Sequence, residues 1–179
     1  MRRRRLLGLT AAATAVGAAG CLGNGSGPAD AGESSDGGDR VEWPAGTYAD
    51  YETTTVTVEG PDGEERGSVT AAIADDRDKL VLGLSDAEAL PEDGGMLFVY
   101  DSPRERLTFI MPNMDFGIDI VFVDSDREIT RIHNAPEPGP NEDGSEQEYD
   151  GSGQYVLEVP YEWTDRHGVE VGDSLRFDL

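Results

Sequence analysis

The segment "TFIMPNMDFGIDIVFVD", residues 108–124, holds the side chains best suited to bind a ligand or act on one. Asn113 and Asp119 lie where an apolar run breaks and a strand is about to begin, and Met111 precedes them. Loops at such positions can bring polar groups together around a pocket. We therefore take Met111, Asn113 and Asp119 as candidates for a ligand pocket.

Two interpretations of Asp119 follow from its position. In the first, Asp119 is a buried carboxyl group with a raised pKa that works with Asn113 on a bound ligand. In the second, Asp119 accepts backbone N–H bonds and fixes the bend before a hairpin, as a short acid at a bend commonly does.

The remaining polar side chains form no pattern typical of a catalytic or metal site. Asp124, Asp126 and Glu128 are spaced like part of a calcium loop, but the glycine of an EF-hand loop is absent, and a turn between strands explains them equally well. His133 and His167 stand apart, whereas a zinc site needs three or four ligands. No nucleophile-elbow motif is present. The sequence predicts no catalytic residue, no metal and no cofactor.

Acidic residues outnumber basic residues along the chain. The 179 residues carry a formal charge of −23, and Lys79 is the only lysine. Nucleic-acid binding depends on Lys and Arg contacts with phosphates, so we expect no nucleic-acid partner. An acid-rich, lysine-poor composition is typical of proteins from salt-loving microbes, where salt screens the repulsion between surface charges. The composition therefore indicates a halophilic, haloarchaeal-type protein.

Residues 1–20 have the layout of a secretory signal, with four arginines, an Ala-rich apolar stretch and small residues before Cys21. Adjacent arginines followed by leucines are typical of a twin-arginine export signal. The Ala-Gly-Cys ending resembles a lipobox, so we predict that Cys21 is lipidated and anchors the exported protein to the outer face of the cell membrane. In the alternative, the protein is secreted in the ordinary way, and Cys21 is discarded or left free.

Composition divides the rest of the chain into a linker and one domain. Residues 21–49 are dominated by Gly, Ser, Asp and Pro, and we expect a flexible acidic linker there. Residues 50–179 hold short β-branched runs separated by turn signals, which predict many short strands. The length of this part favours a single domain.

The expected strands and helices define the fold class. The strands are expected at 53–60, 68–75, 96–100, 107–111, 118–124, 128–132, 154–159 and 171–179, and the helices at 75–84 and 160–168. Asp75 or Asp76 is expected to cap the first helix, and Gly168 to end the second. Loops are expected at 101–106 and, as a mobile acidic surface loop, at 136–153. The predicted fold is mainly β (α+β), a compact β-sandwich or jelly-roll-like, partly open barrel with two short helices.

Four blocks of this domain follow one another in order: "GMLFVY", "FIMPN", "IDIVFVD" and "YVLE", with Gly168, Gly172 and Asp173 after them. They resemble the family called domain of unknown function 192 (DUF192). Its members carry Gly-Met-Leu-Phe-Val-Phe, Phe-Trp-Met-Lys-Asn, Leu-Asp-Ile-Ile-Phe-Ile-Asp, Tyr-Val-Leu-Glu and a Gly-x-x-x-Gly-Asp segment. The resemblance implies a compact, β-rich, jelly-roll-like domain that is often exported, and it implies no activity.

The chain departs from that family pattern at two cationic positions. The segment "IMPNM" holds no Trp and no Lys, where the pattern has Trp-Met-Lys-Asn. The segment "GLSDAEAL" holds no Met and no Arg after Gly83 and Leu84, where the pattern has Gly-Leu-Met-x-Arg. An anionic ligand held through those cations would be bound poorly by this chain.

Three functions remain open from the sequence. The first, which we favour, is an envelope lipoprotein that binds a small ligand or a partner protein without catalysis, through a roomy apolar pocket with few polar groups. The second is a hydrolase-like enzyme that uses Asp119 and Asn113, with Asp119 exposed in a concave site. The third is a structural or assembly factor of the envelope, with a flat exposed apolar patch of roughly several hundred Å².

Overall fold

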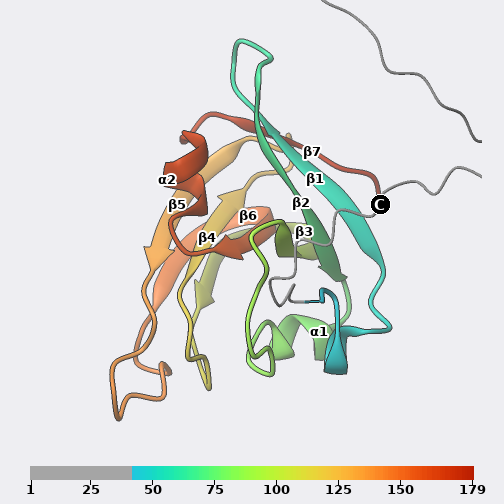
Figure 1. Ribbon diagram of the computed structural model, residues 1–179. Coiled ribbons are helices and arrows are strands. Elements are labelled where there is room, and N and C mark those ends of the chain that lie inside the picture. The colour runs from blue at the N-terminus through green and yellow to red at the C-terminus, as the bar shows by residue number, and fades with distance from the viewer. Residues whose placement is uncertain (1–41) are drawn as a thin grey trace, which may run out of the picture. The chain divides into compact units, whose positions relative to one another are not determined.

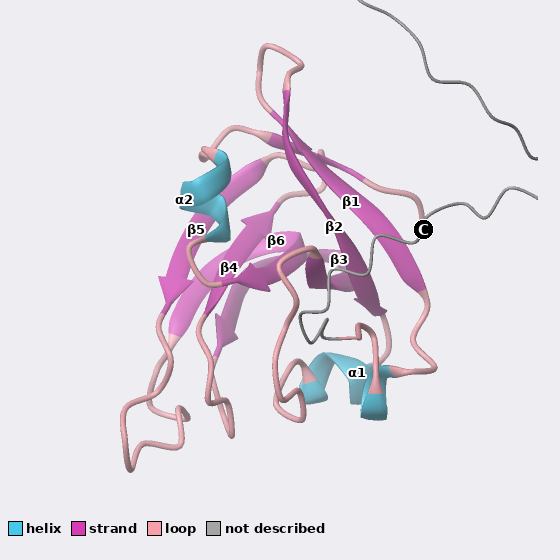
Figure 2. Cartoon of the chain, in the orientation of Figure 1, coloured by secondary structure: helices cyan, strands magenta, loops and turns pink. Residues whose placement is uncertain are grey.

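The computed structural model describes residues 42–179, which form a mainly β domain with two short α-helices (Figures 1 and 2). The elements in chain order are η1 (Gly46–Tyr48, a 3-10 helix), β1 (Thr53–Glu59), β2 (Glu65–Ala74), α1 (Arg77–Leu82), β3 (Gly94–Phe109), β4 (Ile118–Val123), β5 (Ile129–Ala135), β6 (Tyr149–Pro160), α2 (Trp163–His167) and β7 (Ser174–Arg176). The predicted mainly β class with two short helices is confirmed. The predicted signal segment and Cys21 lie outside the described residues.

The seven strands form one sheet that curls into a half-barrel (Figure 1). Their order across the sheet is β5-β4-β6-β3-β2-β1-β7. Neighbouring strands are antiparallel except β2 and β3, which are parallel and are connected through α1. The edge strands approach each other at one end, where Glu128 and Ser174 form a β-bridge. The structure is therefore a partly open barrel, and the sandwich or jelly-roll arrangement is not confirmed.

Apolar side chains cover both faces of this sheet. Along β4, Ile120 and Phe122 belong to a cluster near α1, while Val121 and Val123 belong to a second cluster that contains Trp163 of α2. Successive residues of this strand therefore face opposite sides of the sheet. Because a core lies on each side, all six residues of β4 are buried. Asp119, also in β4, is therefore a polar residue that is fully buried in the sheet.

Helix α1, Arg77–Leu82, lies within the predicted range 75–84, and Asp76 is its cap. Oδ1 of Asp76 accepts hydrogen bonds from the backbone N–H groups of Asp78 at 2.9 Å and Lys79 at 3.0 Å, which satisfies two free donors of the first turn. Gly83 follows the helix with φ = 51°, a conformation that glycine adopts without strain. The side chain of Val81 is 78% exposed, so this helix presents an apolar residue to solvent.

One expected loop is wrong and another is shorter than expected. Residues 101–106 belong to β3, which continues through this polar stretch and pairs with β6 across two shifts of register. Their side chains are exposed, and among them Arg104 is paired with Gly153 of β6, so side-chain polarity is a poor guide to the end of this strand. The acidic loop predicted at 136–153 ends earlier, because β6 begins at Tyr149.

Residues 42–49, which composition assigns to the linker, pack on the domain. Tyr48 is 1% exposed, and its ring centre lies 5.1 Å from that of Trp43. Nε1 of Trp43 donates a hydrogen bond to the carbonyl oxygen of Gly95 at 2.9 Å. These two aromatic side chains hold the segment against the domain, because they bury a large apolar surface.

Candidate functional site

The three residues expected to form a pocket have different surroundings. Met111 is fully buried, and its backbone N–H donates to the carbonyl oxygen of Gly144 at 3.2 Å. Asn113 is exposed with φ = 57°, and its backbone N–H donates to the carbonyl oxygen of Asp143 at 3.0 Å. These two bonds fasten the acidic loop after β5 to the segment after β3. In both bonds the donor is a backbone N–H group, so the side-chain amide of Asn113 takes no part in them.

Asp119 is fully buried and accepts four hydrogen bonds. Its Oδ1 accepts from the backbone N–H of Glu162 at 2.9 Å and from Nδ2 of Asn134 at 3.0 Å. Its Oδ2 accepts from the backbone N–H of Thr164 at 2.8 Å and from the hydroxyl of Thr164 at 2.7 Å. Burial raises the pKa of Asp119, and the hydrogen bonds from Thr164 and Glu162 lower it.

Asp119 acts as a helix cap supplied from another element. Glu162, the residue before α2, has φ = 58° and makes no side-chain cap. The carboxyl group of Asp119 takes that place by accepting from the N–H groups at the start of α2. As in the second interpretation above, Asp119 accepts backbone N–H bonds. It does so from the start of α2, however, and not from the bend next to itself. The two carboxyl oxygens are already occupied by protein donors.

A different place on the domain has the properties of a ligand pocket. A cavity of about 290 Å³ lies between α1, residues 110–114 and the sheet. We call it the Glu158 cavity. It is lined by Leu80, Val81, Leu82, Gly83, Leu84, Ser85, Phe98, Tyr100, Thr108, Phe109, Ile110, Pro112, Met114 and Glu158. Met111, Asn113 and Asp119 are not among these lining residues.

Glu158 is the polar group that distinguishes this cavity. It lies in β6 opposite Met96 of β3 and Ile120 of β4, both fully buried, and its own side chain is 4% exposed. Within residues 42–179, its Oε2 has no hydrogen-bond partner. Burial alone raises the pKa of Glu158 to about 8, because the charged form is poorly solvated there. The carboxyl group is therefore mostly protonated at neutral pH.

Aromatic rings and exposed aliphatic side chains form the walls and the rim of the Glu158 cavity. The rings of Phe98 and Phe109 meet edge to face, with their centres 5.0 Å apart. Burial raises the pKa of Tyr100, and the negative charge of Glu158 raises it further. Val81 is 78% exposed and Ile110 is 42% exposed. Apolar walls around one free carboxyl group are typical of a small-molecule site.

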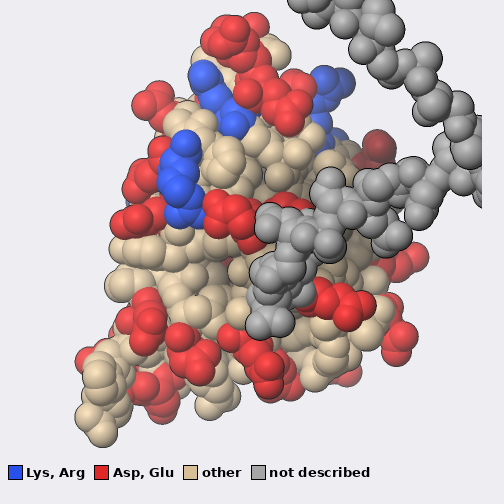
Figure 3. Space-filling view, viewed as in Figure 1, with Lys and Arg blue, Asp and Glu red and all other residues tan. Residues whose placement is uncertain are grey.

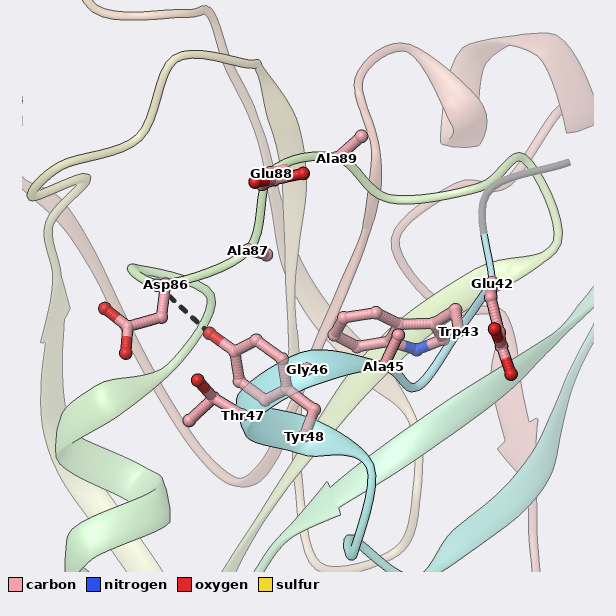
Figure 4. Close-up of a pocket in the computed structure, with 10 residues that line it drawn as sticks. All are labelled: Glu42, Trp43, Ala45, Gly46, Thr47, Tyr48, Asp86, Ala87, Glu88 and Ala89. Carbon is pink, nitrogen blue, oxygen red and sulfur yellow. Dashed lines mark hydrogen bonds between the residues drawn. The ribbon is translucent and has the colours of Figure 1, made fainter. Parts of the chain in front are cut away.

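A second cavity, of about 510 Å³, lies between residues 42–48 and the loop after α1 (Figure 4). Its lining includes Trp43, Tyr48 and residues 86–89. The Tyr48 hydroxyl accepts a hydrogen bond from the backbone N–H of Asp86 at 3.1 Å. Burial raises the pKa of Tyr48 to about 12, so the phenol stays neutral. The polar groups of this cavity are thus paired or solvated, and we place the candidate site at the Glu158 cavity.

The sequence contains a signal for Glu158 that lies outside the predicted site residues. In "YVLEVP" an acid interrupts an apolar strand, and it shares a face with Val156, two residues earlier. An acid on the apolar face of a strand is rarely buried without a partner. The segment 108–124 indicated the place of the cavity more directly than this signal did. Thr108, Phe109 and three later residues of that segment line the cavity.

Three further observations concern the described residues as a whole. In residues 42–179, no group of three or more His, Cys, Asp or Glu side chains could hold a metal ion. No helix in this same part of the chain is long and apolar enough to span a membrane. Asp and Glu side chains are spread over the face seen in Figure 3, where Lys and Arg side chains are few.

Comparison with known proteins places the domain in a family. Residues 58–177 match the model of the DUF192 family, described as Uncharacterized ACR. The crystal structure of a candidate transcription regulator from Sinorhizobium meliloti 1021 is 29% identical, and the match covers 71% of this chain and 95% of that chain with a TM-score of 0.64. That of a protein of unknown function from Novosphingobium aromaticivorans DSM 12444 is 25% identical, with coverage of 76% and 94% and a TM-score of 0.62. No curated protein matches. The family match spans most of the described domain, and the chain belongs to the DUF192 family.

Proposed function

We propose that this DUF192 protein is a binding module without catalysis, and that the Glu158 cavity holds a small, largely apolar ligand. The observation that carries the proposal is the buried carboxyl oxygen of Glu158, which has no protein partner in residues 42–179 and lines an apolar cavity of about 290 Å³. A buried polar atom without a partner is costly, at about 1–3 kcal/mol, so a ligand that supplies a hydrogen bond there gains that energy.

The hydrolase-like alternative has less support from the geometry. It requires Asp119 to be exposed, whereas Asp119 is fully buried and its two oxygens accept four hydrogen bonds. The assembly-factor alternative requires a flat apolar patch, whereas the exposed apolar side chains Val81 and Ile110 border a cavity. The description of the S. meliloti protein as a regulator is not carried over, because an acidic surface repels nucleic acid.

The proposal includes an exported, lipid-anchored protein of a halophile, and the sequence supports this part. The layout of residues 1–20, the Ala-Gly-Cys ending and the charge of −23 are the supporting features. Intact mass of the protein extracted from host membranes checks the anchor. A mass that begins at Cys21 with a lipid supports it, and an unmodified mass contradicts it.

The binding proposal predicts a ligand that co-purifies with the protein. The full chain is purified from its host at high salt and measured by native mass spectrometry. The wild-type protein should carry a small adduct, and Ser85→Phe should lose it, because Ser85 lines the cavity and a ring at this position occupies the ligand volume. Ser102→Phe makes the same substitution at an exposed position of β3.

The control variant separates ligand loss from a general effect of the substitution. Ser102→Phe should retain the adduct. Both variants should give the same circular dichroism spectrum as the wild type. An adduct that persists in folded Ser85→Phe would show that the ligand lies elsewhere. A wild-type protein that carries no adduct and binds none of the probes described below would overturn the proposed function.

A further inference from the structure

We infer that the ligand of the Glu158 cavity is an organic cation, an apolar body that carries a primary ammonium group, and that this group donates to the carboxyl oxygens of Glu158. The inference rests on the proposed function and names the ligand class for the same site. It follows from the hydrogen-bonding capacity, the charge and the walls of the cavity.

The hydrogen-bonding capacity of Glu158 favours a ligand that donates. Oε2 of Glu158 is buried and unpartnered within residues 42–179, so the ionised carboxyl group offers a free acceptor to a ligand. Met96 and Ile120, the residues opposite Glu158 on the neighbouring strands, are apolar and have no donor to offer. An ammonium group has three donors and no acceptor, and a bond to a carboxylate is about twice as strong as one between neutral groups.

The charge of the lining residues favours a cation over an anion. None of the lining residues of the cavity is Lys or Arg, so no cation of the lining competes for Glu158 or attracts an anion. The titratable groups near Glu158 are Tyr48, from the segment before β1, and Tyr100 of β3. Both are phenols that burial keeps neutral, and α1 contributes only Leu80, Val81 and Leu82. Arg104 lies over the Tyr100 ring, 5.6 Å from its centre, outside the lining.

The walls of the cavity suit a cation with an apolar body. The lining contains three aromatic rings, those of Phe98, Tyr100 and Phe109. Aromatic faces attract cations, and this attraction strengthens where water is excluded. The remaining lining is mostly aliphatic, which suits an apolar body next to the charged group. A cavity of about 290 Å³ accepts a molecule with one ring or a short chain.

Binding of such a cation changes the protonation of Glu158. In the free protein, burial raises the pKa of this group to about 8, so the carboxyl group holds a proton at neutral pH. When the ammonium group binds, it stabilises the carboxylate, and the proton of Glu158 is released to solvent. The affinity for the cation should therefore rise with pH, by about tenfold per unit below about pH 8.

Three probes with the same ring and different polar groups test the inference. Isothermal titration calorimetry of the full chain is performed with benzylammonium, benzyl alcohol and benzoate. High salt screens attraction to the acidic surface, while a buried pair is screened much less. We expect benzylammonium to bind at least about tenfold more tightly than benzyl alcohol near pH 9, and benzoate to bind more weakly than either.

Two variants locate the preference at Glu158. Glu158→Gln keeps the shape and removes the charge, so it should bind benzylammonium and benzyl alcohol equally and lose the pH dependence. Glu105→Gln removes an exposed charge of β3 and should behave like the wild type. Proton release, measured from the heat in buffers of different ionisation enthalpy, should occur only when Glu158 is present.

The outcomes separate this inference from the proposed function. If benzyl alcohol binds and Ser85→Phe removes that binding, but benzylammonium shows no preference, the cavity is a ligand site and the organic-cation inference is wrong. If benzylammonium preference persists in Glu158→Gln, the cation lies elsewhere and the inference is also wrong. If none of the three probes binds and no adduct co-purifies, both proposals fail.

Discussion

Replacing Asp119 with alanine should lower the free energy of unfolding by about 3–5 kcal/mol. The substitution removes an acceptor of four hydrogen bonds and leaves the N–H and hydroxyl of Thr164 without a partner in a buried environment. It also removes the cap of α2, whose preceding residue Glu162 supplies none of its own. Denaturation by urea at high salt, followed by circular dichroism, measures the change.

Two comparisons make this prediction specific. Asp115→Ala removes an exposed acid a few residues away and should change the free energy of unfolding by less than about 0.5 kcal/mol. Asp119→Asn, under conditions where it is folded, should still bind benzyl alcohol, because Asp119 does not line the Glu158 cavity. A stable Asp119→Ala protein, or a stable Asp119→Asn protein that has lost ligand binding, would instead support a functional role for Asp119.

Glu158 should make the free energy of unfolding depend strongly on pH. Its pKa is raised from 4.5 to about 8 in the folded protein, so between these values the unfolded chain releases a proton that the folded chain retains. The contribution of Glu158 to stability is fully present below about pH 4.5 and is lost as the pH rises to about 8. The full shift corresponds to at most about 5 kcal/mol.

The measurement compares the wild type with Glu158→Gln across this pH range. Asp119 also has a raised pKa, so both proteins lose stability from that group, and the difference between them isolates Glu158. Glu158→Gln should match the wild type near pH 4.5 and be more stable by several kcal/mol near pH 8. Glu105→Gln should follow the wild type at every pH. A difference between wild type and Glu158→Gln that does not change with pH would mean that Glu158 titrates normally.

Local signals of the sequence predicted the elements of the fold well. The cap at Asp76 and the end of α2 at Gly168 depend on residues close together in the chain, and the structure has them. The path of β3 through residues 101–106 depends on pairing with β6, which lies about fifty residues later. Such pairing leaves no periodic signal in a polar stretch, so the sequence indicated a loop.

The candidate site was harder to predict because its parts come from distant segments. The sequence pointed to the 108–124 segment, and residues of that segment do line the Glu158 cavity. It did not show that Glu158, far along the chain, lies in the same cavity without a partner. For Asp119 the sequence allowed a raised pKa, and burial raises it. The sequence did not show that both carboxyl oxygens of Asp119 accept from the start of α2 and from Asn134, because the fold alone brings these groups together.

One departure from the DUF192 pattern lies at the same cavity. Ile110 and Pro112 line it, and they stand where the family pattern has Trp and Lys. A lysine at position 112 would bring a cation to the border of a cavity that here contains only the carboxyl group of Glu158. This chain thus has the acid Glu158 of the family pattern, and it has the apolar Pro112 where that pattern has a lysine.

The ¹³C NMR titration of the Glu158 carboxyl group in the full chain tests the central claim most directly. Spectra of the free protein are compared with spectra at saturating benzylammonium and saturating benzyl alcohol, and Glu158→Gln identifies the signal. We predict a midpoint near the pKa of about 8 in the free protein and a clearly lower midpoint with benzylammonium. Benzyl alcohol should perturb the signal without lowering its midpoint. A midpoint near the ordinary pKa of 4.5, or a signal that no probe perturbs, would contradict a ligand site at Glu158.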